Sequence, residues 1–95
     1  MTLAKKDVQS SLLKKGFHQS EGDHIFFHYQ RLNGTKTKIK TKYSHGKPNY
    51  IGLVLIQKMS QQCKLNKDDF VLMISCSIDQ AKYESILIEK GILTK

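Results

Sequence analysis

The sequence contains little cysteine and no long apolar run. Its two cysteines, Cys63 and Cys76, belong to no closely spaced metal-binding or redox motif, and one pair makes a poor disulfide framework. Both are therefore expected to be small buried side chains in a reducing compartment. Residues 1–20 lack the apolar region of a signal peptide, and no apolar run has the length that crosses a bilayer. These absences predict a cytoplasmic protein that makes no membrane contact.

Acidic residues are also scarce. Eight Asp and Glu stand against 16 Lys and Arg, which gives a formal net charge of +8 and a pI near 9.6. Residues 1–50 hold ten of the basic residues and three acids, whereas residues 51–95 hold six and five. A basic excess confined to one half of a chain is typical of a nucleic-acid-binding surface. The alternative is a solvated lysine-rich face or a guarded sheet edge.

Several enzyme motifs are missing. The chain has no phosphate-binding loop, no dinucleotide fingerprint and no motif of paired carboxylates, and no nucleophile signature surrounds its serines or cysteines. We therefore expect no cofactor. A chain of 95 residues fits one domain with one core, over residues 1–95.

The segment from Gly22 to Tyr43 predicts a β-hairpin. Two runs of aromatic, β-branched and alternating polar residues flank Asn33-Gly34, a pair that favours a tight turn with positive φ at both positions. Side chains alternate between the two faces of a strand. One face should therefore pack on helices and the other should be open. The open face is expected to carry histidines, an aromatic ring and lysines: His24, Phe26, His28, Lys36, Lys38, Lys40 and Lys42.

Apolar spacing elsewhere predicts four helices and one more strand. The strand starts at Phe17, directly after Gly16, which suits the left-handed position that follows a helix. The helix over residues 50–63 should be largely buried. The four helices are expected over about residues 3–15, 50–63, 67–74 and 78–90, with caps at Asn49, Asn66 and Ser77 and a stop at Gly91.

This order, α-β-β-β-α followed by extra C-terminal helices, predicts an α+β domain of two layers. Helices would cover one face of a three-stranded antiparallel sheet. The same layout occurs in double-stranded-RNA-binding domains. The expected core consists of apolar residues from the strands and the second helix: Phe17, Ile25, Phe27, Tyr29, Ile39, Ile51, Leu55 and Met59.

The four histidines are the candidate groups for acid–base chemistry near neutral pH. His24 and His28 would stand about 13 Å apart on a strand, because each residue adds about 3.3 Å. They cannot share one zinc ion, and His18 beside either would give only two ligands, so we expect no metal site. His18 is expected to be a surface residue, and the loop residue His45 could contact a phosphate, although no pattern supports this.

His24 suits a metal-independent ribonuclease. In such an enzyme a histidine activates the RNA 2′-hydroxyl for attack on the neighbouring phosphate, and lysines stabilise the added negative charge. His24 beside four lysines would supply both parts. His28 and Phe26 remain open, since each is either an RNA contact on the exposed face or an ordinary surface residue.

Five short segments have the order and character of one known family. They are Leu12-Leu13-Lys14-Lys15-Gly16-Phe17, Gly22-Asp23-His24 with Ile25-Phe26-Phe27-His28, the basic third strand with its Pro48-containing loop, Gln61-Gln62-Cys63-Lys64-Leu65, and Asp68-Asp69-Phe70. On these segments the chain resembles the HicA family of mRNA interferase toxins, over about residues 3–74.

The resemblance implies a double-stranded-RNA-binding-domain fold, metal-independent cleavage of mRNA, and neutralisation by a HicB-type antitoxin protein. It assigns the catalytic role to His24. Two features depart from the family pattern. Asp23 replaces the usual small hydroxyl residue. Residues 76–95 extend past a HicA-like core of residues 1–75, where they could cover the sheet, form a homodimer or bind another partner.

Two further functions stay open. A module of the same fold can bind RNA without cleaving it, in which case Asp23 disables His24 instead of orienting its ring. A protein-interaction module would use the C-terminal helices, and its lysine face would only solvate the fold. In the nuclease and in the RNA-binding module, the phosphate and RNA contacts are the same: Lys36, Lys38, Lys40, Lys42 and His28.

Overall fold

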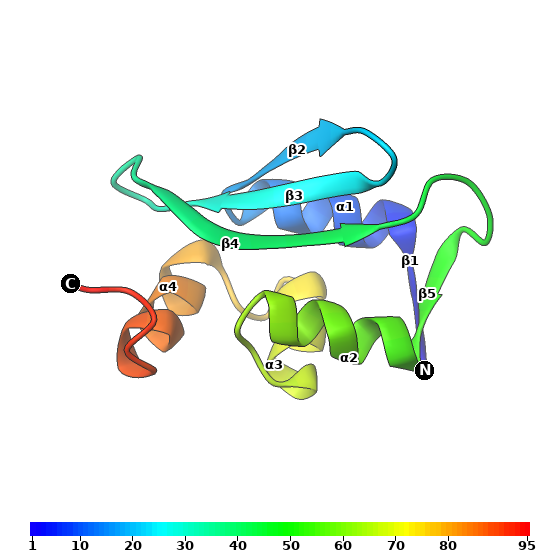
Figure 1. Cartoon of the computed structure of the whole chain (residues 1–95). Coiled ribbons are helices and arrows are strands. Elements are labelled where there is room, and N and C mark those ends of the chain that lie inside the picture. Colours follow the sequence, from blue (N-terminus) through cyan, green and yellow to red (C-terminus); the bar gives the residue numbers. More distant parts are fainter.

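A three-stranded antiparallel sheet forms one layer of the computed structural model, which describes residues 1–95. Its strands are β2 (Phe17–Glu21), β3 (Ile25–Gln30) and β4 (Lys36–Tyr43), and β3 is central. The other layer consists of helices (Figure 1): α1 (Lys5–Lys14), α2 (Leu53–Gln62), α3 (Lys67–Ile74) and α4 (Gln80–Glu89). The predicted α+β domain is confirmed. None of its helices combines the length and apolar character needed to cross a membrane.

Side chains of the sheet alternate as the sequence pattern predicts. Phe27 and Tyr29 of β3 are almost fully buried, and Ile39 and Tyr43 of β4 are buried as well. Each such side chain contributes roughly 1.5–3 kcal/mol by leaving water, and a slip of one residue would exchange the faces. Burial of one face therefore fixes the register. Every second residue of β4 is exposed. These residues, called the lysine row below, are Lys36, Lys38, Lys40 and Lys42.

One core of 18 buried apolar residues joins the sheet to all four helices. Among the expected core residues, Ile25 and Leu55 are only partly buried and the others are enclosed. α4 contributes Tyr83, whose ring lies 5.0 Å from that of Tyr29 and 5.7 Å from that of Phe17, measured between centroids. Residues 76–95 thus share the core of the rest of the chain.

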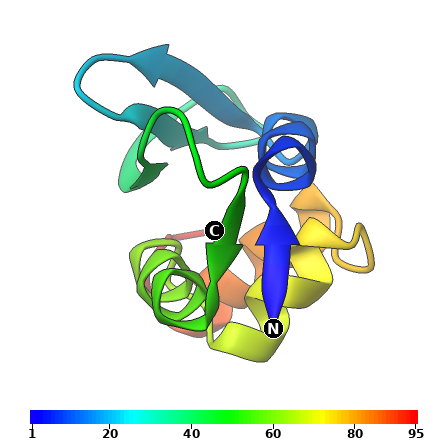
Figure 2. The ribbon, with the colours of Figure 1, turned by 90° about the vertical axis from the view of Figure 1, so that its right-hand side faces the viewer.

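A second, two-stranded antiparallel sheet pairs β1 (Thr2–Ala4) with β5 (Tyr50–Gly52). Figure 2 shows the two strands side by side, blue and green, in front of the helices. The pairing takes the first residues of two predicted helices, so α1 and α2 start later than expected. The predicted cap at Asn49 is also wrong, because the N-cap of α2 is Gly52. Pairing buries Ile51, which is 1% exposed.

The hairpin of β3 and β4 closes through a three-residue loop, Leu32–Gly34, and not through the expected two-residue turn. Among the three loop residues, only Gly34 has positive φ, at 86°. Its N–H donates to the carbonyl of Arg31, and the Arg31 N–H donates to the carbonyl of Thr35, both at 2.8 Å. This pattern is a type I turn followed by a left-handed residue. The Asn33 side chain accepts the Thr35 N–H at 2.9 Å, so Asn33 supports the loop without adopting positive φ.

Every helix is followed by a residue in the left-handed region. Gly16 and Gly91 take this position after α1 and α4, as predicted. Glycine is needed at position 16 for two reasons. Its φ is positive, and a Cβ there would overlap the Gln80 side chain. After α2 and α3 the position is held by Lys64 and Cys76, with φ of 63° and 67°. A left-handed geometry costs a residue with a Cβ about 1–2 kcal/mol.

The N-cap residues of α3 and α4 test two predictions. Asn66 caps α3 as expected, because its side-chain oxygen accepts the Asp69 N–H at 2.7 Å. The predicted cap of α4 at Ser77 is wrong. Asp79 is the cap, and its carboxylate accepts the Lys82 N–H at 2.8 Å.

A buried polar network fastens α4 to the end of β3. The Glu84 carboxylate accepts hydrogen bonds from the Tyr29 hydroxyl at 2.8 Å, the Leu32 N–H at 3.1 Å and the Arg31 guanidinium at 3.2 Å. Burial acts to raise the pKa of Glu84, but these hydrogen bonds outweigh it and hold that pKa below its usual value. α4 is therefore bound to the sheet by charge as well as by its apolar side chains.

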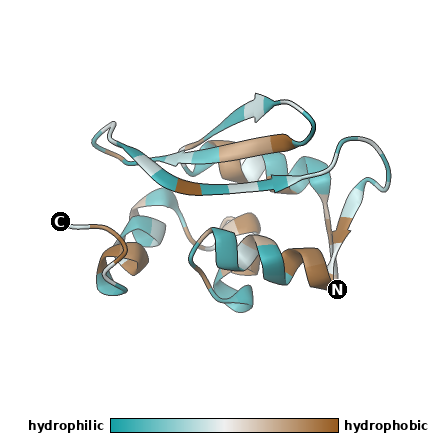
Figure 3. Cartoon of the chain, in the orientation of Figure 1, coloured by the Kyte–Doolittle hydropathy of each residue, from teal (hydrophilic) through white to brown (hydrophobic).

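α2 is buried on one side only, so the prediction of a largely buried helix is wrong. Ile56 and Met59 are fully enclosed, but Val54 is 81% exposed and Leu53 is 43% exposed. Figure 3 shows the apolar start of α2 close to the N-terminus, at the rim of the molecule. The apolar repeat that begins at Ile51 belongs partly to β5, which places the first turn of α2 outside the core.

Cys76 is exposed, whereas Cys63 is buried, so the expectation of two buried thiols is wrong for Cys76. The ammonium of Lys15, a buried residue, lies 3.1 Å from the Cys76 sulfur, and the Ser11 hydroxyl lies 3.7 Å from it. Hydrogen bonds from Lys15 and Ser11 lower the pKa of Cys76. Burial raises the pKa of Cys63.

Cys76 is expected to react with iodoacetamide in the native protein, and Cys63 only after unfolding. Since the thiolate is the reactive species, Cys76 should be alkylated at lower pH than an ordinary thiol. Lys15→Met should move that reactivity to higher pH. Mass spectrometry of the alkylated peptides over a pH series measures both effects, and equal labelling rates for the two cysteines would contradict the structure.

Candidate nucleic-acid interface

The open face of the β2-β3-β4 sheet gathers the basic and aromatic side chains into cross-strand rows. The antiparallel register sets His18 of β2 opposite His28 of β3, and His28 opposite Lys40 of β4. The next row along the strands contains Ser20, Phe26 and Lys42. Directly opposed residues have Cβ atoms about 4.5–5.5 Å apart, so side chains within a row can act on one ligand.

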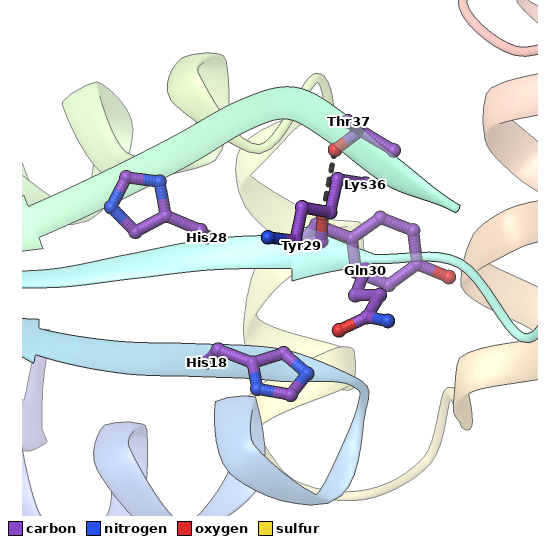
Figure 4. Close-up of a pocket in the computed structure, with 6 residues that line it drawn as sticks. All are labelled: His18, His28, Tyr29, Gln30, Lys36 and Thr37. Carbon is purple, nitrogen blue, oxygen red and sulfur yellow. Dashed lines mark hydrogen bonds between the residues drawn. The ribbon is translucent and has the colours of Figure 1, made fainter. Parts of the chain in front are cut away.

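A pocket of about 360 Å³ opens on this face. Figure 4 shows the His18 ring from β2, the His28 ring from β3 and the Lys36 side chain from β4 around the same opening. The pairing of β3 and β4 shifts register between His28 and Gln30, and there the Thr37 hydroxyl donates to the Tyr29 carbonyl at 2.8 Å. The pocket therefore lies beside the irregularity in the pairing of β3 and β4.

Three rings, called the ring row below, follow one another along the open side of β3 and the residue before it: His24, Phe26 and His28. Their centroids are 6.2 Å apart for His24 and Phe26 and 6.4 Å apart for Phe26 and His28. The Lys42 ammonium lies 5.8 Å from the centre of the Phe26 ring, which is a cation–π arrangement. Rings beside ammonium groups on an open surface are the usual means of binding single-stranded nucleic acids.

His24 lies immediately before β3, and its side chain is 37% exposed. Its Nδ1 atom is buried, has no hydrogen-bond partner and lies 3.6 Å from the Asp23 carboxylate. That separation is too long for a hydrogen bond. Nε2 is thus the ring nitrogen that can meet a substrate. The nearby His45 has a structural role, because its Nε2 bonds to the Gly22 carbonyl at 2.9 Å.

A second hollow, of about 530 Å³, lies beside β4 and the C-terminal residues 92–94. Its lining includes four basic side chains and no acid: Arg31, Lys36, Lys38 and Lys64. The positive charge of the open face thus continues around the edge of β4.

The predicted site residues share one face without meeting at one point. His28 and Lys36 line the pocket, while His24 stands two ring positions away along β3. His18, which the sequence patterns leave without a role, enters the pocket. Its orientation follows from alternation, because Phe17 points into the core, but its place opposite His28 depends on the pairing of two strands.

No group of three or more His, Cys, Asp and Glu side chains is arranged to hold a metal ion. Comparisons of the chain with protein-family models, with curated proteins and with solved structures found no match in any of the three. The geometry of the open face therefore carries the functional argument.

Proposed function

We propose that the open face of the β2-β3-β4 sheet binds RNA, and that the protein is a metal-independent endoribonuclease of the HicA toxin type. The observation that carries the proposal is the cross-strand register. It sets a ring of β3 opposite a lysine of β4 twice, as Phe26 with Lys42 and His28 with Lys40. Neither row contains an acid, so both suit the phosphate and base of a nucleotide.

His24 is the proposed general acid–base. Its Nε2 takes the proton of an RNA 2′-hydroxyl while that oxygen attacks the adjacent phosphorus. The bond from phosphorus to the 5′-oxygen breaks, this oxygen takes a proton from solvent, and His24 then releases its own extra proton to solvent. The products are a 2′,3′-cyclic phosphate and a 5′-hydroxyl, and no water is consumed. Lysines stabilise the extra negative charge of the transition state, of which Lys42 is the first along β4 from the His24 end.

The resemblance to the HicA family supports the same proposal, and so does the succession of α1, the three strands of the β2-β3-β4 sheet and α2, to which the short strands β1 and β5 are added. The finer fold class proposed is a sandwich similar to double-stranded-RNA-binding domains. The proposed substrate is mRNA in the cytoplasm, and the proposed protein partner is a HicB-type antitoxin. α4 packs into the core through Tyr83 and Leu87, which leaves the open face free for these ligands.

The test is a cleavage time course on a mixed-sequence mRNA in EDTA, with wild type beside His24→Ala. We expect cleavage by the wild type, and a rate at least about 100-fold lower in the variant, the usual effect of removing a positioned acid–base group. Fragments that end in a 2′,3′-cyclic phosphate would identify the chemistry. Undiminished cleavage by His24→Ala would overturn the role of His24, and no cleavage by either protein would overturn the nuclease.

An RNA-binding module without cleavage is the second candidate, and the surroundings of His24 favour it. The Asp23 carboxylate lies 3.6 Å from the ring, near the place where a phosphate would bind, and Nδ1 has no partner to orient it. In this case the wild type retains RNA on a gel at low salt and yields no fragments. Negligible RNA affinity at low salt would instead favour a protein-interaction module.

A further inference from the structure

The ring row repeats at a spacing that stacked nucleotides do not have. Its centroid separations of 6.2 and 6.4 Å approach the two-residue repeat of a strand, about 6.6–6.8 Å. Successive stacked bases within one duplex strand rise by only about 3.4 Å. Bases that lie on successive rings must therefore be unstacked from each other. Single-stranded RNA can adopt this state, and a duplex cannot.

Two of the three rings have a lysine opposite them on the neighbouring strand. Phe26 faces Lys42 and His28 faces Lys40 across the β3–β4 pairing. Neighbouring strands lie about 4.7–4.9 Å apart, so a base on either ring has a cation within reach of its own phosphate. Each of these two cross-strand pairs provides one ring and one lysine, just as each nucleotide of RNA provides one base and one phosphate.

The far end of the ring row is built for an anion. His18, Gln30 and Lys36 surround the pocket beside His28, from three different strands (Figure 4). Each of these side chains can donate a hydrogen bond, and no acid lines the pocket. Its volume of about 360 Å³ leaves room for a phosphate group. A phosphate group fits both the size and the donors.

We propose that the ring row binds three successive unpaired nucleotides of RNA, and that His18, His28 and Lys36 hold a phosphate two nucleotides away from the one at His24. The inference rests on the proposed function for placing RNA on this face. It adds the unpaired form of the RNA and one contact, His18, and it assigns His28 and Lys36 to one particular phosphate. Two ring-to-ring steps separate His24 from His28, so one phosphate does not touch both. The pocket is a binding subsite, and the reacting phosphate stays at His24.

The form of RNA is tested with a probe that cannot be cleaved. A fluorescent 2′-O-methyl RNA decamer is offered at about 0.1 M salt, either single-stranded or annealed to its complement, and anisotropy gives both affinities. The wild type should bind the single strand at least about tenfold more tightly than the duplex. Phe26→Leu should weaken single-strand binding about tenfold, because a base–aromatic stack is lost. The salt slope should not change, because no charge is lost.

Phe26→Tyr is the matched control. It keeps the aromatic ring and should retain the affinity that Phe26→Leu loses. Equal thermal unfolding of the three proteins would show that the loss arises at the RNA and not in the fold. Tighter binding of duplex than of single strand by the wild type, or unchanged affinity in Phe26→Leu, would overturn the inference.

The phosphate pocket is tested with the double variant His18→Ala/Lys36→Gln. Its salt slope for the single-stranded probe should be shallower than that of the wild type by about 0.7, the effect of one lost phosphate contact. With a cleavable RNA its KM should rise more than its kcat falls, because the pocket lies away from the reacting phosphate. Lys58→Gln removes one exposed charge from α2 and serves as the control. A fall in kcat without a rise in KM would overturn the subsite.

The outcomes separate this inference from the proposed function. Binding of the single strand in the expected way, without cleavage of any RNA, would overturn the nuclease and keep the inference. Cleavage combined with a preference for duplex would do the reverse. Failure to bind either probe would overturn both.

Discussion

Replacing all four residues of the lysine row by glutamine should weaken binding of single-stranded RNA several hundred-fold at about 0.1 M salt. Each lysine that meets a phosphate releases a counterion and adds about 0.7 to the slope of log affinity against log salt. Four lost contacts should make the slope about 2.8 units shallower. Isotherms at several salt concentrations measure both quantities. Parallel salt dependences for variant and wild type would show that the row does not contact phosphate.

A control with the same net charge separates the row from the charge of the whole protein. It carries glutamine at four exposed lysines outside the sheet: Lys6, Lys58, Lys82 and Lys95. This variant should lose less than about one unit of salt slope, because these lysines lie on helices or at the C-terminus and meet no phosphate. A loss as large as that of the lysine-row variant would mean that overall charge drives the binding.

Glu84→Ala should lower the free energy of unfolding by about 3–5 kcal/mol, the usual cost of removing one partner from a buried ion pair. The variant leaves the Arg31 guanidinium, the Tyr29 hydroxyl and the Leu32 N–H without an acceptor. The buried Nε atom of Arg31 already lacks a hydrogen-bond partner, so the loss of Glu84 would leave a further part of its guanidinium unpaired. Domains are stable by only about 5–15 kcal/mol, and a loss of this size approaches unfolding. Urea denaturation followed by circular dichroism measures it.

Glu89→Ala is the matched control for that experiment. Glu89 lies on the same helix but is exposed, and its replacement should change stability by less than about 0.5 kcal/mol. An equal loss in both variants would mean that the removal of a negative charge from α4, and not the loss of the network, is responsible.

The pH dependence of stability is a second check on Glu84. Its pKa in the folded protein lies below the ordinary value of 4.5, so the folded state favours the ionised carboxylate. The resulting stability is fully present above pH 4.5 and disappears as the pH falls through the lower, folded-state pKa. Glu84→Gln cannot titrate and should lose less stability over that acid range. Identical acid profiles for the variant and the wild type would contradict the role of the network.

The faces of the sheet are predictable from the sequence because burial acts with a period of two residues. Phe27 and Tyr29 lie in the core and the lysine row is exposed, as the alternation predicts. Gly16 and Gly91 are predictable for a different reason, since positive φ after a helix disfavours residues with a Cβ and glycine adopts it freely. Both signals are local and need no knowledge of distant partners.

The features that the sequence does not predict depend on distant partners. β1 and β5 are three residues each, and they pair Thr2 with Gly52, far apart in the chain. His18 joins the pocket only through its pairing with His28. The cap of α4 is similar, because Ser77 and Asp79 can both cap a helix. The structure uses Asp79, and the same helix docks Glu84 against the end of β3, a contact that no local pattern reveals.

β4 ends the sheet with eight residues, and no strand pairs with its outer side. A bare edge of this kind can template a strand from another copy of the chain, and protruding lysines oppose such self-assembly by mutual repulsion. The lysine row therefore also acts as a barrier to fibre formation. On the proposed function, RNA bound to the row would neutralise these charges and remove this barrier for as long as it stays bound. A variant without these charges should aggregate more readily at high protein concentration, whatever its affinity for RNA.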